Sequence, residues 1–168
     1  MRPRLVVVAG MSGAGKSTLD AALAQRLGAR FIEGDDLHPA ANRAAMAAGQ
    51  PLDDAMRAGW LDSVGAALAA SHAAGQGAVA ACSALTRAYR DRLRDAAGAP
   101  VAFLCLIAPA GALQDRLRRR SGHFMPLSLL PSQLATWQSP DPDEPDTHVL
   151  NALLDPPALL DAALAALG

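Results

Sequence analysis

An α/β fold with a parallel sheet is the fold class that the sequence predicts, on two observations. First, short apolar runs such as "LVVVA" at 5–9 alternate along the chain with segments of helical periodicity. Second, these runs are nearly continuous, which is typical of strands buried on both faces. Strands that are separated by helices imply right-handed crossovers, so we expect a three-layer arrangement with helices covering the sheet.

Four strands and six helices follow from these patterns in chain order. The strands are expected at 5–9, 30–34, 78–82 and 101–107. The helices are expected at 16–27, 40–48, 57–74, 86–97, 110–120 and 156–168, several of them ended by a glycine such as Gly28, Gly49 or Gly75. A further strand within "HVLNALL" at 148–154 is poorly defined, and the acidic, proline-rich stretch before it is expected to be a surface loop.

The composition indicates a single domain over residues 1–168. Hydrophobic residues make up 51% of the chain and the formal net charge is -1, which favours neither disorder nor a surface for polyanions. Cys82 and Cys105 belong to apolar runs, so we expect reduced core thiols. No signal peptide fits before the first strand, and no apolar run approaches the roughly 20 residues of a membrane helix. A cytoplasmic location without membrane contact is therefore expected.

The stretch "GMSGAGKST" at 10–18 stands between the first strand and the first helix. Gly10, Gly15, Lys16 and Ser17 satisfy the phosphate-binding pattern G-x-x-x-x-G-K-[ST], and the strand and helix on either side are the context that it requires. Backbone N–H groups and the helix N-terminus would hold the phosphates, the lysine would add a charge, and the Ser17 hydroxyl would ligate Mg²⁺. ATP is preferred to GTP because no guanine-reading "NKxD" tetrapeptide is present. The nucleotide-binding residues are expected to be Gly10, Ser12, Gly13, Ala14, Gly15, Lys16, Ser17 and Thr18.

The segment "EGDDLHP" at 33–39 follows the second strand. Because ligands of parallel sheets bind beyond the carboxyl ends of the strands, Asp35, Asp36 and His38 are expected to face the γ-phosphate. An aspartate there would orient an attacking hydroxyl or accept its proton, and we assign this role to Asp35. Asp36 remains open between such a function and the N-cap of the next helix.

The end of the third strand and the helix after it supply further polar candidates. Ser83 offers a hydroxyl at the carboxyl edge of the sheet. Arg87 and Arg90 lie on the following helix, where they are expected to hold an anionic acceptor.

The segment "RLRRRSGHFMP" at 116–126 is rich in arginine, and we expect it to begin a mobile lid over about 116–138. Arg116 and Arg120 share one helical face and would meet the charge of the transferring phosphoryl group, while closure excludes water. His123 is left open between contact with acceptor hydroxyls and packing at the hinge. Nucleic-acid binding is the weaker interpretation, because the chain is nearly neutral and no aromatic residues are interleaved.

These blocks together resemble the gluconokinases of the small P-loop type, which are related to shikimate kinase and the nucleoside monophosphate kinases. The resemblance spans residue 5 to about 145 and rests on "GDDLHP", "CSAL…YRDRLR", "GHFM…LLxSQ" and "PDE" as well as the phosphate-binding pattern. It implies a carbohydrate kinase that transfers the ATP γ-phosphoryl group to the 6-hydroxyl of D-gluconate. A five-stranded parallel sheet, a small helical lid and, in many members, a homodimer are also implied.

The resemblance also assigns roles to individual positions. Lys16 and Ser17 match the phosphate and metal residues, Asp35 matches the acceptor-activating carboxylate, and Arg116 and Arg120 match the lid. His38, Arg90 and His123 match residues on the substrate side.

The chain departs from the family pattern in the region expected to bind the acceptor. Ala45 and Thr86 stand where members commonly carry lysine, and the run at 53–56 differs from the usual acidic and polar one. Two alternatives therefore remain beside gluconate kinase. One is a kinase of another small sugar acid or a shikimate-like acceptor, and the other is a nucleotide-binding regulatory protein that has lost transfer.

Overall fold

Five parallel strands form one sheet in the computed structural model, which describes residues 4–10, 16–119 and 135–168. The strand order is β2-β3-β1-β4-β5, so the first strand is central. On β1, Val7 pairs with Ala80 of β3 on one side and with Phe103 of β4 on the other. The strands are β1 (Leu5–Gly10), β2 (Arg30–Glu33), β3 (Ala78–Ala81), β4 (Val101–Ile107) and β5 (Thr147–Asn151).

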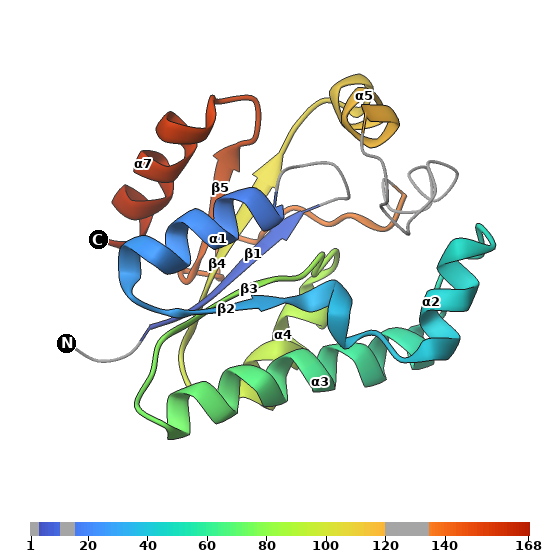
Figure 1. Cartoon of the computed structure of the whole chain (residues 1–168), viewed down its shortest axis with the longest axis horizontal. Helices are drawn as coiled ribbons and strands as arrows, with labels where there is room; N and C mark the ends of the chain where they lie inside the picture. Colours follow the sequence, from blue (N-terminus) through green and yellow to red (C-terminus); the bar gives the residue numbers. More distant parts are fainter. Residues whose placement is uncertain (1–3, 11–15, 120–134) are drawn as a thin grey trace.

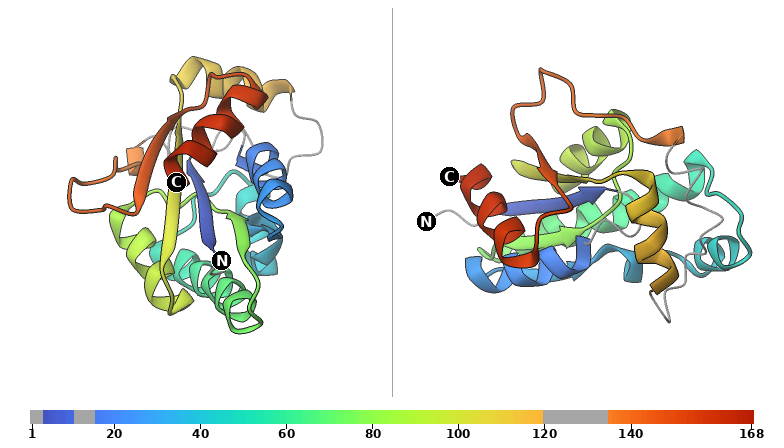
Figure 2. Two further views of the ribbon diagram at one scale, coloured as in Figure 1. Left: turned by 90° about the vertical axis from the view of Figure 1, so that its left-hand side faces the viewer. Right: turned by 90° about the horizontal axis from the view of Figure 1, so that it is seen from above.

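Helices cover both faces of this sheet (Figures 1 and 2). Helices α1 and α7 pack together on one face, and α3 and α4 pack together on the other. Beyond the carboxyl ends of the strands lie α2 and α5 (Figure 1). The helices are α1 (Lys16–Leu27), α2 (Ala40–Ala47), α3 (Asp54–Ala73), α4 (Arg87–Ala97), α5 (Ala110–Arg119) and α7 (Pro156–Leu167), and η1 (Gly34–Leu37) is a short 3₁₀ turn.

The central strand shows why its sequence is apolar throughout. Val6 and Val8 belong to the core under α1 and α7, whereas Leu5, Val7 and Ala9 belong to the core over α3 and α4. All five side chains are buried. Alternate residues of a strand point to opposite faces, so a strand covered on both sides has no polar position. The three-layer α/β fold with five parallel strands is thereby confirmed.

The observed element bounds differ from the predicted ones in two informative places. Helix α3 starts at Asp54, three residues before the predicted start, because the Asp53 carboxylate accepts a hydrogen bond from the Met56 amide at 2.8 Å and caps it. The poorly defined strand is β5, which begins before "HVLNALL" and ends at Asn151.

Two glycines let the strand ends approach one another at the site end of the sheet. A Cβ on Gly34 would overlap the Ala81 carbonyl oxygen at the end of β3. Gly10 has φ of 137°, and a Cβ there would lie 2.7 Å from the Leu106 carbonyl oxygen. Larger residues at either position would push apart the strands that carry the site.

The two cysteines are buried free thiols, as expected. Burial raises the pKa of Cys82 to about 12 and that of Cys105 to about 11. Both groups are therefore protonated and unreactive at neutral pH. Among the described helices, none is long and apolar enough to cross a membrane.

Candidate active site at the carboxyl ends of the strands

The first turn of α1 carries two residues of the phosphate-binding motif side by side. Lys16 Nζ donates a hydrogen bond to the Gly10 carbonyl oxygen at 3.0 Å, so this side chain bends back over the end of β1. Ser17 Oγ donates to Glu33 Oε2 at 2.5 Å. Thr18 is exposed on the same turn. The other predicted nucleotide-binding residues, Ser12, Gly13, Ala14 and Gly15, lie outside the described residues.

Glu33 is a site residue that the sequence reasoning missed. It ends β2, and its carboxylate joins α1 to the loop that follows, because Oε2 accepts from Ser17 and Oε1 accepts from the Asp35 amide at 3.4 Å. A signal for it was present: the argument that places Asp35 beyond the carboxyl end of a strand applies equally to the last residue of that strand.

Asp35 and His38 lie together on the loop after β2. His38 Nε2 is 3.9 Å from Asp35 Oδ1, and 31% of the Asp35 side chain is exposed, so this carboxylate is accessible to a ligand. Asp36 is exposed and lies within the 3₁₀ turn, and the helix that follows, α2, has Pro39 at its N-cap with no side-chain hydrogen bond. The cap interpretation of Asp36 is therefore wrong, and its functional interpretation stays a prediction.

Two side chains from helices shape this loop. The Arg43 guanidinium on α2 donates to the carbonyl oxygens of Asp35, Asp36 and His38 at 2.9 to 3.4 Å. Trp60 on α3 donates its indole N–H to the Gly34 carbonyl oxygen at 2.8 Å. The loop that carries Asp35 is therefore held by hydrogen bonds from two separate helices.

The His38 imidazole is buried and stacked on Trp60. The two ring centroids are 4.1 Å apart and the ring planes differ by 15°. The pKa of His38 is lowered to about 4, mainly by burial; the charge of Asp35 opposes this effect and the charge of Arg43 adds to it. His38 is therefore neutral at physiological pH.

The end of β3 closes the site from a third strand. The Ser83 carbonyl oxygen accepts from the Gly10 amide at 3.2 Å, which ties this loop to the start of the phosphate-binding segment. Ala84 has φ of 41°, a left-handed conformation that is strained for alanine and is typical of functional loops. The charges of Asp35 and Glu33 add to the raised pKa of Cys82 and the charge of Lys16 opposes it, so these three groups lie near the end of β3.

Asp20 is a buried carboxyl next to this cluster. It lies on α1 three residues after Ser17, it is fully buried, and neither carboxyl oxygen has a hydrogen-bond partner among the described residues. Burial, and secondarily the charge of Glu33, raise the pKa of Asp20 to about 9. Asp20 is therefore protonated at neutral pH.

Arg87 and Arg90 are engaged by acidic residues of the 139–147 loop. Arg90 is fully buried, and its Nε and Nη2 both donate to Glu144 at 2.9 Å. Arg87 contacts Asp141 and Asp143 at 3.3 and 2.8 Å. The predicted contact of the two arginines with an acceptor stays a prediction, and these ion pairs give both of them a structural role.

Three residues of the predicted lid lack described side chains. Arg116 lies on α5, but its side chain is not described. Arg120 and His123 lie outside the described residues. The far end of the segment is attached to the body, since the Gln138 amide donates to the Leu85 carbonyl oxygen at 2.7 Å.

The departures from the family pattern have local structural explanations. Thr86 caps α4 by accepting from the Tyr89 amide at 3.1 Å. Asp53 caps α3, and Asp54 accepts a hydrogen bond from the Tyr89 hydroxyl at 2.8 Å. Ala45 lies on α2. Asp53 and Thr86 therefore each stabilise the N-terminus of a helix.

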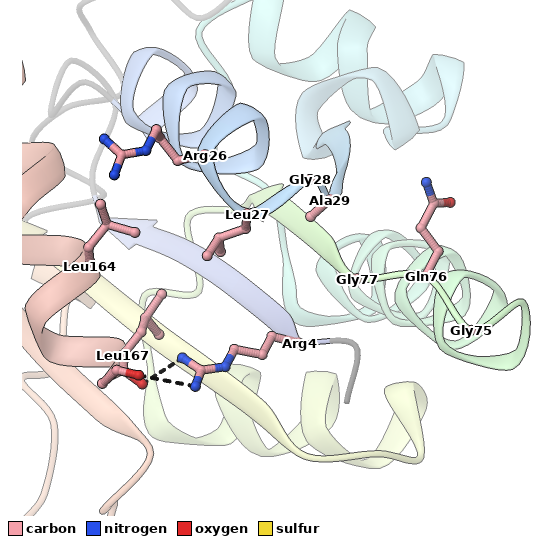
Figure 3. A pocket seen from close by; sticks show the side chains of 11 residues that line it. Arg4, Arg26, Leu27, Gly28, Ala29, Gly75, Gln76, Gly77, Leu164 and Leu167 are labelled. Carbon is pink, nitrogen blue, oxygen red and sulfur yellow. Dashed lines mark hydrogen bonds between the residues drawn. The ribbon is translucent and has the colours of Figure 1, made fainter. Parts of the chain in front are cut away.

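A separate pocket of about 530 Å³ lies at the opposite edge of the sheet, where the strands begin (Figure 3). Arg4 lines it and donates to the carbonyl oxygens of Leu167 and Gly168 at 2.6 and 3.2 Å, as the dashed lines show. Arg26 and Leu27 bring the end of α1 to the same pocket. Arg4 therefore offsets the negative end of a helix here, away from the candidate site.

A parallel sheet with a phosphate-binding motif after its central strand and a carboxylate loop after the next strand in the chain defines a P-loop phosphotransferase. The family model described as an AAA domain matches residues 5–140. A gluconokinase of Gluconobacter oxydans is 53% identical over 149 residues, which are 89% of this chain and 83% of that protein. The chain belongs to the gluconokinase family.

Two solved structures agree with this assignment. A sugar kinase from Janibacter sp. superposes with a TM-score of 0.91 at 43% identity, covering 98% of this chain and 94% of that one. A gluconokinase from Sinorhizobium meliloti superposes with a TM-score of 0.86 at 41% identity, covering 98% and 91%.

Proposed function

We propose that this protein transfers the γ-phosphoryl group of ATP to the 6-hydroxyl of D-gluconate, giving 6-phospho-D-gluconate. The observation that carries the proposal is the accessible Asp35 carboxylate on a loop that Glu33 links to Ser17 of the phosphate-binding helix. Membership of the gluconokinase family supports the choice of acceptor. In this proposal, the carboxylate that activates the acceptor lies next to the segment that binds the phosphates of the donor.

The chemistry would rest on position and charge. Lys16 and the N-terminus of α1 would neutralise the donor phosphates, because a lysine and the backbone N–H groups of a first helical turn meet there. Asp35 would orient the attacking hydroxyl and accept its proton as the oxygen–phosphorus bond forms and the bond to ADP breaks. An in-line transfer of this kind needs no covalent intermediate on the protein.

Magnesium fits the residues next to the phosphate cradle. The Ser17 hydroxyl and the Glu33 carboxylate are both oxygen donors, the ligand type that Mg²⁺ prefers. We assign Ser17 as the direct ligand and Glu33 as the group that orients it. The ion would supply charge neutralisation for the β- and γ-phosphates.

The remaining predicted residues complete the proposal. The acceptor would be bound by His38, Ser83, Arg87, Arg90 and His123. The single kinase domain would have a lid at about 116–138, in which Arg116 and Arg120 close over the donor phosphates. We further propose that the enzyme is cytoplasmic and that it acts on a small molecule and not on nucleic acid. We also propose that it forms a homodimer, as the resemblance to the gluconokinases implies.

ADP release measured over a panel of sugar acids, with shikimate included, tests the acceptor. We expect the highest kcat/KM with D-gluconate and a product that carries phosphate on the 6-hydroxyl. A higher kcat/KM with another acid would replace gluconate with that acceptor. Tight ATP binding without turnover on any acceptor would favour the regulatory alternative.

Asp35→Asn tests the acceptor-activating carboxylate. The amide keeps the shape of the side chain but does not accept a proton, so kcat should fall about 10²- to 10⁴-fold while the KM for ATP changes little. The matched control is Asp161→Asn, an exposed aspartate on α7 away from the site, which should keep kcat within about threefold of wild type. If kcat is unchanged in Asp35→Asn, a residue other than Asp35 activates the acceptor hydroxyl.

A further inference from the structure

The Asn42 side chain on α2 has a hydrogen-bond arrangement that determines which way its amide points. Nδ2 donates to the Met56 carbonyl oxygen at 3.0 Å. A carbonyl oxygen only accepts, so the atom facing it must be the nitrogen of the amide. The same Nδ2 lies 3.2 Å from His38 Nδ1, and its second hydrogen is available for this contact.

The orientation of Asn42 in turn determines the tautomer of His38. Because Nδ2 donates, His38 Nδ1 must accept and carries no proton. The buried imidazole is neutral, so its single proton is on Nε2. Stacking on Trp60 holds the plane of the ring. The protonated Nε2 therefore lies 3.9 Å from Asp35 Oδ1.

We propose that Asn42 is a positioning residue that holds His38 in the Nε2–H tautomer, so that this N–H group and the Asp35 carboxylate bind one hydroxyl group of the acceptor together. The proposal rests on the proposed function for its acceptor. It adds a residue on α2 that the sequence did not single out.

The geometry suits an alcohol. One oxygen can lie about 2.8 Å, the ordinary length of such hydrogen bonds, from each of two atoms that are 3.9 Å apart. A hydroxyl would accept from His38 Nε2–H and donate its own proton to Asp35. The other tautomer would present two acceptors, of which a hydroxyl satisfies only one. Asn42 therefore decides whether the pair recognises an alcohol through one or two hydrogen bonds.

Nitrogen-15 NMR spectra of the imidazole side chains test the tautomer without substrate. The chain has four histidines, and loss of a signal in His38→Gln identifies the one from His38. In the wild type near pH 7 we expect a neutral ring with the proton on Nε2. A proton on Nδ1 in the wild type overturns the proposal, and this measurement needs no Asn42 variant.

Asn42→Asp tests whether Asn42 is the cause. A carboxylate at this position accepts from Nδ1, so we expect the proton to move to Nδ1 or the ring to become protonated. The matched control is Arg43→Gln, which removes the support of three loop carbonyls but keeps the contact of Asn42 with the ring. We expect Arg43→Gln to keep the Nε2–H tautomer. An Asn42→Asp spectrum identical to the wild type contradicts the proposal.

Kinetics separate this inference from the proposed function. In Asn42→Asp we expect kcat/KM for the acceptor to fall about tenfold or more while the KM for ATP stays the same. A changed tautomer with unchanged acceptor kinetics would refute the shared hydroxyl contact. A wild type that turns over no gluconate would contradict the proposed acceptor alone, since the spectra are recorded without any acceptor.

Discussion

The side chains at the carboxyl end of β2 show how single residues at this site depend on burial. The Glu33 carboxylate accepts a hydrogen bond from Ser17, whereas the fully buried Asp20 nearby has no hydrogen-bond partner among the described residues. A buried polar group without a partner costs free energy, and a carboxyl responds by keeping its proton. His38 responds to the same burial in the opposite direction, because its charged form is the protonated one.

Asp20→Ala should therefore stabilise the protein, by about 1–3 kcal/mol in the free energy of unfolding at neutral pH. The pKa of Asp20 is raised from 3.8 to about 9 on folding, so between these values the folded state holds a proton that the unfolded chain lacks. The contribution of Asp20 to the free energy of unfolding of the wild type therefore falls as the pH rises from about 4 to about 9. Urea unfolding at several pH values should show a gain from Asp20→Ala that grows with pH.

The control for this prediction is Asp161→Ala, which removes an exposed carboxyl from α7. We expect it to change the free energy of unfolding by less than about 0.5 kcal/mol, as exposed surface substitutions do. A constant gain in Asp20→Ala across this range would show that the folded protein does not keep the Asp20 proton.

At the scale of elements, α3 and α4 form the most extensive helix contact described, and a glycine sets how close they come. A Cβ on Gly65 of α3 would overlap the Ala96 Cβ of α4. Gly59 on the same helix has open space at its Cβ position. Of these two glycines, packing against α4 requires only Gly65.

Gly65→Ala should destabilise the protein by about 1–3 kcal/mol, because the added methyl group must separate two packed helices. Gly59→Ala should stabilise it by about 0.5–1 kcal/mol, since alanine favours a helix where nothing is displaced. Equilibrium unfolding of both variants measures the two effects. The same sign for both substitutions would refute this account of the α3–α4 contact.

At the scale of the whole molecule, the strand order explains why the site lies where it does. The chain places β3 between β1 and β2, so the ends of these three strands meet beside the start of α1. Arg90 and Glu144, 54 residues apart, join α4 to the loop before β5. Hydrogen bonds from the Arg90 guanidinium lower the pKa of Glu144 to about 2, against the opposing effect of burial. The body around the site is therefore held by contacts between distant parts of the chain.

Binding of ATP with magnesium should stabilise the folded protein as a whole. At a ligand concentration of about 100 times Kd the expected gain is about 2.7 kcal/mol, or a rise in Tm of roughly 5–10 °C for a chain of this length. Lys16→Ala should lose most of this rise while its own Tm without ligand stays close to the wild type. Differential scanning calorimetry measures both quantities.

Arg26→Ala is the matched control, because it removes a positive charge from the other end of the same helix, at the opposite edge of the sheet. We expect it to keep the full rise in Tm. If Lys16→Ala also kept the full rise, Lys16 would not be part of the nucleotide site.

Much of the architecture was predictable from local patterns. The apolar run that forms β1 and the motif that ends in Lys16 and Ser17 are short, and their meaning does not depend on distant residues. Helix α1 and strand β4 have the predicted bounds. The edge strand β5 was harder to place, because the polar residues Thr147, His148 and Asn151 break the continuous apolar pattern that marks a fully covered strand.

By itself the sequence determined the fold class, the phosphate-binding motif and the carboxylate loop, because each is encoded in neighbouring residues with a fixed spacing. Only the tertiary structure decided which partners these side chains have. The contact of Ser17 with Glu33, the orientation of Asn42 by Met56 and the burial of Arg90 against Glu144 all join separate elements. Such contacts depend on which strands are neighbours and which helix faces meet, and no local pattern specifies that.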